Sequence, residues 1–141
     1  MRKVDIQFLD QGFHRVLFNA MPLPVFVVDE DVCILEYNAA AARLLKKDKR
    51  LIIGRRCGEV LRCLHSQDVP DGCGRAPACR NCLVRRAVRT AARGRRITRR
   101  KAEMVLVRNG KRAKVAVRVS CQPFTYGRRS FILLILEGLN G

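Results

Sequence analysis

The chain has 141 residues, which suffices for one ordinary domain with a hydrophobic core that needs no disulfide bonds to fold. Its longest apolar run, FILLIL at 131–136, is far shorter than the ~20 residues that span a bilayer, and Asp5, Gln7 and Asp10 interrupt any secretory leader, so we expect a cytoplasmic protein. A total of 29 Lys and Arg against 12 Asp and Glu gives a formal charge of +17, which predicts attraction to polyanions but does not indicate a fold.

The first segment has the pattern of an amphipathic helix. Apolar side chains recur at helical spacing over residues 3–20, at Val4, Phe8, Phe13, Val16, Leu17 and Phe18. The sequence MPLP at 21–24 ends this helix, because proline lacks an amide hydrogen and biases the preceding residue away from helix. We therefore predict an N-terminal amphipathic helix at 1–20 and a domain at 21–141.

The next segment predicts a hairpin followed by a helix. VFVVDEDVCILEYN at 25–38 contains two short runs of β-branched and aromatic residues joined at DED, which is typical of a tight hairpin. Asn38 suits the N-cap of a short helix, AAAARLL at 39–45, which stops in the basic loop KKDKR at 46–50.

The second half predicts one amphipathic helix and three antiparallel strands. The helix covers 82–94, with Arg85, Arg86, Arg89 and Arg93 on its polar side and Gly94 as its C-terminal cap; the apolar stripe comprises Leu83, Val84, Ala87, Val88, Ala91 and Ala92. Asn109-Gly110 is a strong signal for a two-residue hairpin between strands at 101–107 and 111–124, and alternation in the second strand predicts one buried face. A last strand covers 130–137.

This order of elements predicts an α+β fold in which helices pack on one face of a single sheet. MPLPVFVVDEDVCILEYNAAAARLL at 21–45 resembles the opening of a PAS sensor domain, and the later helix, the RNGK hairpin and the apolar last strand follow the order of that family over about residues 20 to 138. The resemblance implies a PAS-like five-stranded antiparallel sheet with an N-terminal flanking helix. It also implies ligand or cofactor sensing, and a homodimer assisted by that helix.

Clustered cysteines are the main candidate for chemistry. The chain has seven cysteines, and four of them, Cys63, Cys73, Cys79 and Cys82, follow the spacing C-x9-C-x5-C-x2-C within a cysteine-rich insert at 57–82. In a reducing cytoplasm such clusters bind metal or carry out redox chemistry more often than they form disulfides. GEVLRC at 58–63 and the Cys-x-x-Cys pair resemble a cysteine-rich subset of bacterial PAS proteins.

Four thiolates suit either zinc or an iron-sulfur cluster. Two Cys-x-x-Cys pairs would favour structural zinc, but this chain has one, and a sensor fold favours iron-sulfur. Cys57 and His65 are the alternative ligands. Reduced thiols without metal, or a thiol switch, remain the simpler alternative. Cys33 and Cys121 lie in predicted strands and are expected to be small core residues.

We expect no enzymatic activity, because the sequence has no phosphate-binding glycine loop, no His-Glu-x-x-His metal site and no nucleophile elbow. The leading hypothesis is a sensory and regulatory signal-transduction module with a four-cysteine metal site, acting on a protein partner. The alternative is a basic nucleic-acid-binding protein with a structural zinc site, in which RTAARGRRITRRK at 89–101 contacts phosphates.

Overall fold

The computed structural model describes residues 11–63 and 82–139. The first half contains helix α2 (Gln11–Ala20), strands β1 (Val25–Val28) and β2 (Ile34–Tyr37), helix α3 (Ala39–Leu45), the 3-10 helix η1 (Lys49–Leu51) and helix α4 (Cys57–Val60). The second half contains helix α5 (Leu83–Ala92) and strands β3 (Ile97–Arg108), β4 (Lys111–Tyr126) and β5 (Arg129–Glu137).

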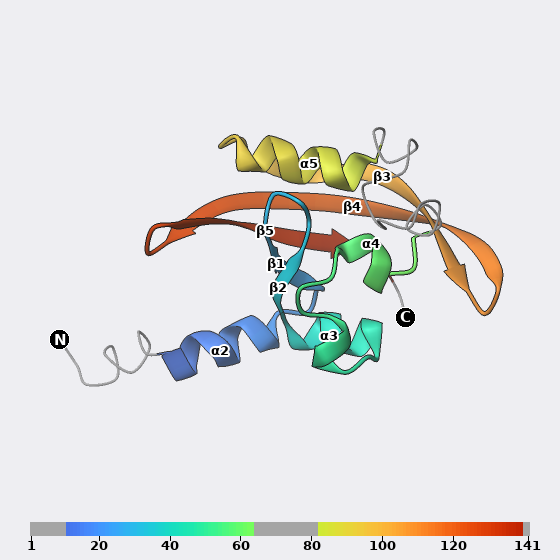
Figure 1. Cartoon of the computed structure of the whole chain (residues 1–141), viewed down its shortest axis with the longest axis horizontal. Coiled ribbons are helices and arrows are strands. Elements are labelled where there is room, and N and C mark those ends of the chain that lie inside the picture. The colour runs from blue at the N-terminus through green and yellow to red at the C-terminus, as the bar shows by residue number, and fades with distance from the viewer. Residues whose placement is uncertain (1–10, 64–81, 140–141) are drawn as a thin grey trace.

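The strands form one antiparallel sheet in the order β2-β1-β5-β4-β3. Strand β5 is the centre of the sheet and joins the short N-terminal hairpin to the long C-terminal hairpin, as Figure 1 shows. Buried side chains from this sheet and from α3, α4 and α5 make a single core. The predicted α+β fold with a five-stranded antiparallel sheet is confirmed.

The first hairpin and α3 are joined by one buried side chain, Asn38, which is 1% exposed. Its Oδ1 accepts hydrogen bonds from the backbone amides of Val25 and Ala41, each at 3.0 Å, and its Nδ2 donates to the carbonyl of Leu23 at 2.9 Å. The predicted N-cap is therefore confirmed, and the same side chain also fixes the start of β1.

The second hairpin turns at Asn109 and Gly110, whose φ angles of 52° and 75° belong to the left-handed region that two-residue hairpins require. Gly138 has a φ of +100°, and a Cβ there would lie 2.6 Å from the carbonyl oxygen of Ala116. Only glycine fits this close approach, which carries the chain on to the buried Leu139.

Helix α5 packs across β3, β4 and β5 with Val84, Ala87, Val88 and Ala91 buried. Three predicted positions on this helix are wrong. Leu83, which is 38% exposed, and Ala92 are exposed although the helical pattern places them on the apolar stripe. Arg85 is only 5% exposed although the pattern places it on the polar side. Arg85 is buried because it forms an ion pair with Asp31 in the β1–β2 turn, which satisfies the guanidinium.

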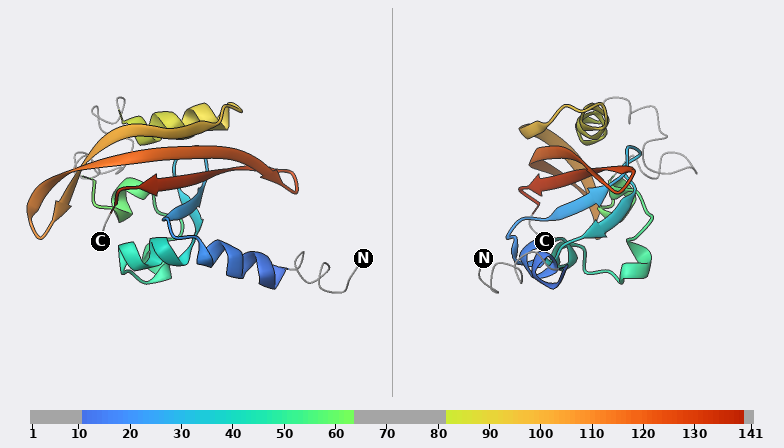
Figure 2. Two further views of the ribbon diagram at one scale, coloured as in Figure 1. Left: turned by 180° about the vertical axis from the view of Figure 1, so that it is seen from behind. Right: turned by 90° about the vertical axis from the view of Figure 1, so that its left-hand side faces the viewer.

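Helix α2 confirms the described part of the predicted N-terminal helix, and residues 1–10 lie outside the described residues. Figure 2 shows α2 extending from the end of the domain beside α3. None of the helices within 11–63 and 82–139 has the length and apolar character that crossing a lipid bilayer requires.

Candidate functional site

Cys63 is held at the end of the α4 turn and against the sheet. Its amide donates to the carbonyl of Gly58 at 2.7 Å, and the residue forms an antiparallel bridge with Leu106 of β3. The neighbouring carbonyl of Arg62 accepts a hydrogen bond from the amide of Val107 at 2.8 Å. Cys63 is half-buried and packs against the core.

Cys82 is the N-cap residue of α5, and its carbonyl accepts the first helical hydrogen bond from the amide of Arg86 at 3.0 Å. It is also half-buried and packs against the same core as Cys63. Helix α4 and the first turn of α5 lie at the same end of the sheet in Figures 1 and 2. The two described members of the predicted set are thus each attached to a regular element next to one core.

The other two predicted ligands, Cys73 and Cys79, lie outside the described residues, as does His65. Within 11–63 and 82–139, no group of three or more His, Cys, Asp or Glu side chains is arranged to hold a metal ion. That observation covers only two members of the predicted set. The four-cysteine metal site therefore remains a prediction.

Three further cysteines differ in their surroundings. Cys57 is the first residue of α4, is 2% exposed in the core, and its amide donates to the carbonyl of Val32 at 3.1 Å. Cys121 is 1% exposed in β4, and burial raises the pKa of its thiol to about 12. The prediction of a core residue is confirmed for Cys121.

The corresponding prediction for Cys33 is wrong. This residue precedes β2, pairs with Arg56 in an isolated bridge, and is half-exposed. Partial burial is the main cause that raises the pKa of its thiol, and the carboxylates of Asp29 and Asp31 raise it further. The strand begins one residue later because the turn is tightened by Asp29, whose Oδ1 accepts from the Cys33 amide at 3.0 Å.

An arginine clamp on Asp31 connects the elements that carry these cysteines. One carboxylate oxygen of Asp31 lies 2.9 Å from Nη1 of Arg85 in α5, and the other lies 2.9 Å from Nη2 of Arg56, the residue before α4. The hydrogen bond to Asp31 is the main cause that raises the pKa of Arg56. This clamp, comprising Asp31, Arg56 and Arg85, ties the β1–β2 turn to the first residues of α4 and α5.

The sequence alone did not reveal this clamp. Asp31 and Arg85 are 54 positions apart, and neither belongs to a recognisable motif. The one available signal was the position of Arg85 beside Val84 and close to the apolar stripe of the helix.

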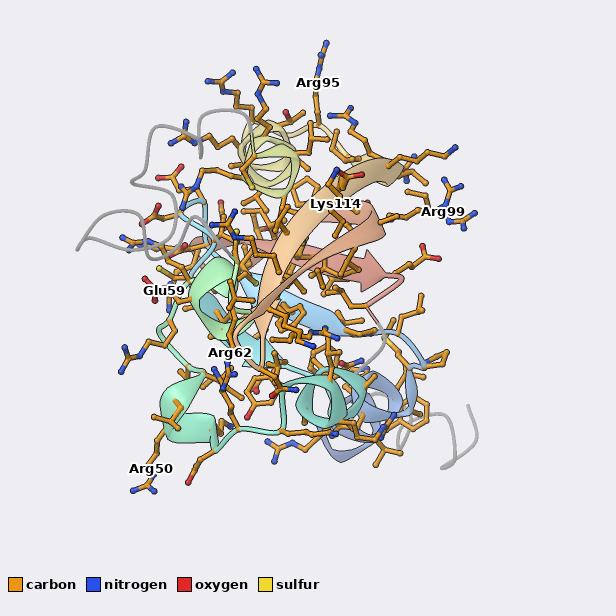
Figure 3. All side chains as sticks on the ribbon, turned by 90° about the vertical axis from the view of Figure 1, so that its right-hand side faces the viewer. Arg50, Glu59, Arg62, Arg95, Arg99 and Lys114 are labelled. Atoms are coloured by element: carbon orange, nitrogen blue, oxygen red, sulfur yellow. The ribbon has the colours of Figure 1, made fainter. Side chains whose placement is uncertain are left out.

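A basic surface, called the basic face below, follows α5 and continues around the edge strand β3. Its exposed residues are Arg86, Arg89, Arg93, Arg95, Arg96, Arg99, Arg100 and Lys101. The sequence has no Asp or Glu between 82 and 102. Arg99 pairs with Glu137 at 3.1 Å, and Figure 3 shows Arg95 and Arg99 projecting outward from this part of the molecule.

The second face of the sheet has an apolar strip. Val27 pairs with Leu133 in the register of β1 and β5, and both are half-buried. The rings of Phe124 and Phe131 continue the strip, with centroids 5.5 Å apart. An open cavity of about 590 Å³ separates Phe18 of α2 from this face. Two apolar side chains of α2, Val16 and Leu17, are 67% and 54% exposed.

Comparison with known proteins gives a consistent result for the fold. A family model described as PAS fold matches residues 18–137. No curated protein matches the chain. Among solved structures, the chain is similar to the PAS domain of an HTR-like protein from Haloarcula marismortui, with 22% identity and a TM-score of 0.56 over 89% of this chain and 94% of that chain.

Two further PAS domains are similar. That of nitrogen regulation protein NR(II) from Vibrio parahaemolyticus has 16% identity and a TM-score of 0.61 over 89% of this chain and 96% of that chain. That of BvgS from Bordetella pertussis has 18% identity and a TM-score of 0.54, over 94% and 87% respectively. Identities this low establish a shared fold alone.

Proposed function

The chain belongs to the PAS fold family of sensory signal-transduction domains, and from this premise we propose that it senses through a metal centre held by Cys63, Cys73, Cys79 and Cys82. We further propose that it acts as a regulator rather than as an enzyme, and that a protein partner receives its signal. Family membership alone does not specify the signal, because one fold serves many ligands.

One observation carries the proposal. Cys63 and Cys82 are the two ends of the proposed ligand set, and both are half-buried against one core at the same end of the sheet. Backbone hydrogen bonds hold Cys63 to Gly58 and Cys82 to the first turn of α5. Ligands attached to regular elements lose less conformational entropy on binding than ligands on a long loop.

The donor set fits a thiolate-bound centre, and we favour an iron-sulfur cluster over zinc. Four cysteine ligands satisfy either group, and the chain has only one Cys-x-x-Cys pair where many structural zinc sites have two. An iron-sulfur cluster would supply a redox change to which the domain responds. Cys57 and His65 are the alternative ligands.

The Asp31 clamp offers a route from the proposed site to the sheet. Arg85 lies three positions after Cys82 in α5, and Arg56 immediately precedes Cys57 in α4. A shift of the start of either helix would therefore alter the ion pairs on the β1–β2 turn. This turn is continuous with β1, which pairs with the central strand β5.

Serine variants test the proposed ligand set. Cys63→Ser, Cys73→Ser, Cys79→Ser and Cys82→Ser should each abolish or sharply reduce metal retention during anaerobic purification, measured as metal per chain. Cys33→Ser and Cys121→Ser are the matched controls and should retain the metal. Full retention in any of the four variants would remove that residue from the set, and Cys57 and His65 would then be substituted.

We also propose that the chain forms a homodimer through α2. Exposed Val16 and Leu17, together with the apolar strip on the second sheet face, present apolar surface that a second copy would cover. Helix α2 lies next to the strip, since one cavity is lined by Phe18 of α2 and by Leu133 of the strip.

The second candidate is nucleic acid binding with structural zinc, which the basic face favours. Phosphate contacts should produce a steep loss of affinity as salt increases. A specific function would add preference for particular sequences or structures, whereas a merely basic surface would not, and we expect no such preference. Binding assays with several duplexes over a salt series measure both properties. Tight, sequence-dependent binding at physiological salt would favour this second candidate.

A further inference from the structure

A cation-lined cavity lies away from the basic face, between the end of α3, the end of α4 and the β3–β4 hairpin. It has a volume of about 310 Å³, and four of the residues that line it are basic: Lys46, Lys47, Arg62 and Arg108. Its volume is at the lower end of the range of about 300–1,000 Å³ that is typical of small-molecule sites. No carboxylate is among its described lining residues.

The basic residues reach this cavity from three separate parts of the chain. Lys46 and Lys47 follow α3, Arg62 follows α4, and Arg108 ends β3. Figure 3 shows Arg62 below α4, toward the loop that follows α3. A run of charge along one solvated helix does not explain this convergence, because the residues lie far apart in sequence.

The positions of these residues are fixed by backbone hydrogen bonds. The carbonyl of Arg62 accepts from the amide of Val107 at 2.8 Å, and Arg62 itself adopts a left-handed φ of 62°. Lys46 caps α3 with a φ of 53°, and its amide donates to the carbonyl of Ala42 at 3.0 Å. The backbone around the cavity is therefore held in place without a ligand.

Like charges at this cavity repel one another. Lys47 is half-buried, and its Nζ donates to the carbonyl of Val60 at 3.3 Å. Burial, and then the charge of Arg62, lowers the pKa of Lys47. An anion in the cavity would relieve this repulsion and accept charge-assisted hydrogen bonds.

We propose that the cavity between α3, α4 and the β3–β4 hairpin binds a small organic anion, a phosphate or dicarboxylate with a short apolar part. The charge follows from Lys46, Lys47 and Arg62, and the apolar part follows from the side chains of Leu44 and Leu61 that also line the cavity. The volume of the cavity matches a small molecule.

This site is independent of the proposed metal centre, although Arg62 immediately precedes Cys63. Anion binding should therefore persist in the Cys82→Ser variant. Loss of metal in that variant together with retained anion binding would separate the two proposals experimentally.

Calorimetric titration of the full chain with ethyl phosphate and with succinate, at constant ionic strength set with sodium chloride, tests the proposal. The two probes distinguish phosphate from carboxylate. We expect saturable binding of at least one probe with one site per chain. Lys47→Gln and Arg62→Gln should each weaken this binding about tenfold or more, as expected for the loss of one charge-assisted hydrogen bond.

Arg95→Gln and Arg96→Gln are the matched controls, because each removes one exposed positive charge of the basic face, outside the cavity. They should change the affinity less than about twofold, because neither residue lines the cavity and salt screens exposed charges over a Debye length of about 10 Å. If Arg62→Gln fails to fold, Arg62→Asn replaces it, since asparagine tolerates the left-handed conformation. Absence of saturable binding for both probes, or equal weakening in the controls and the cavity variants, would overturn the proposal.

Discussion

At the scale of single residues, Asn38 has the largest structural role that the sequence made visible. Its position before an alanine-rich run predicted a helix cap, and the structure adds the bonds to Val25 and Leu23. A cap is predictable because it depends on residues within one turn, whereas the bonds to β1 depend on how the hairpin folds back.

Asn38→Ala should lower the free energy of unfolding by about 2–4 kcal/mol, because it leaves the amides of Val25 and Ala41 and the carbonyl of Leu23 without their buried partner. Urea denaturation measures this change. Asp48→Ala is the control, since Asp48 caps η1 through an exposed 3.3 Å bond to the amide of Arg50, and it should cost less than about 1 kcal/mol. Equal costs would contradict the role given to Asn38.

Cys121 should make stability fall in alkali. Burial raises its thiol pKa from an ordinary 9.0 to about 12, so between these values the unfolded chain releases a proton that the folded chain retains. The unfolded state then binds fewer protons, and the free energy of unfolding decreases as pH rises. The stabilisation is complete below pH 9 and is lost progressively toward pH 12.

Urea denaturation of the parent protein and of Cys121→Ala at several pH values isolates this contribution. Between about pH 9 and 11, the free energy of unfolding of the parent should decrease by roughly 2 kcal/mol relative to that of Cys121→Ala. If the free energy of unfolding changed with pH equally in both proteins, the Cys121 thiol would not have the raised pKa in the folded protein.

At the scale of elements, the sequence predicted those features that repeat locally. The alternation in β4, the Asn109-Gly110 turn and the period of α5 all appear at the expected positions. Burial of Arg85 was missed, because helical periodicity treats a charged side chain as exposed, while its partner Asp31 lies in a distant turn. The cation-lined cavity was missed for the same reason, since its residues come together only in the fold.

Asp31→Asn should destabilise the domain by about 2–3 kcal/mol, because it removes the carboxylate charge facing Arg85, whose side chain is only 5% exposed. Partial exposure of Asp31, at 29%, reduces the effect below that of a fully buried pair. The matched control is Glu103→Gln, which loosens an exposed pair with Lys114 at 3.9 Å and should cost less than about 0.5 kcal/mol. Similar losses in both variants would show that the clamp contributes no more than a surface pair.

At the scale of the whole molecule, the fold could be predicted from sequence order and the candidate site only from cysteine spacing. The order of helices and strands limits an α+β domain to few topologies, and the observed sheet matches the expected one. Spacing identifies a ligand set but does not determine how the chain between Cys63 and Cys82 folds. The structure therefore describes Cys63 and Cys82, whereas Cys73 and Cys79 lie outside the described residues and remain predicted ligands.

A variant that lacks residues 1–19 tests the proposed homodimer. If α2 forms the dimer interface, the shortened chain should be a monomer or should aggregate, because Val16 and Leu17 are lost and the apolar strip on the sheet is uncovered. Light scattering gives the mass of both forms. A dimer of the shortened chain with unchanged affinity would place the interface elsewhere.

The most direct test of the central claim is the visible absorption spectrum of the anaerobically purified chain, recorded together with its metal and sulfide content. A four-cysteine iron-sulfur centre predicts brown protein with iron and acid-labile sulfide in each chain, and a colour that bleaches in air. Colourless protein with one zinc per chain would retain the ligand set but contradict the iron-sulfur assignment. Colourless protein that contains neither metal after anaerobic purification would contradict the metal site itself.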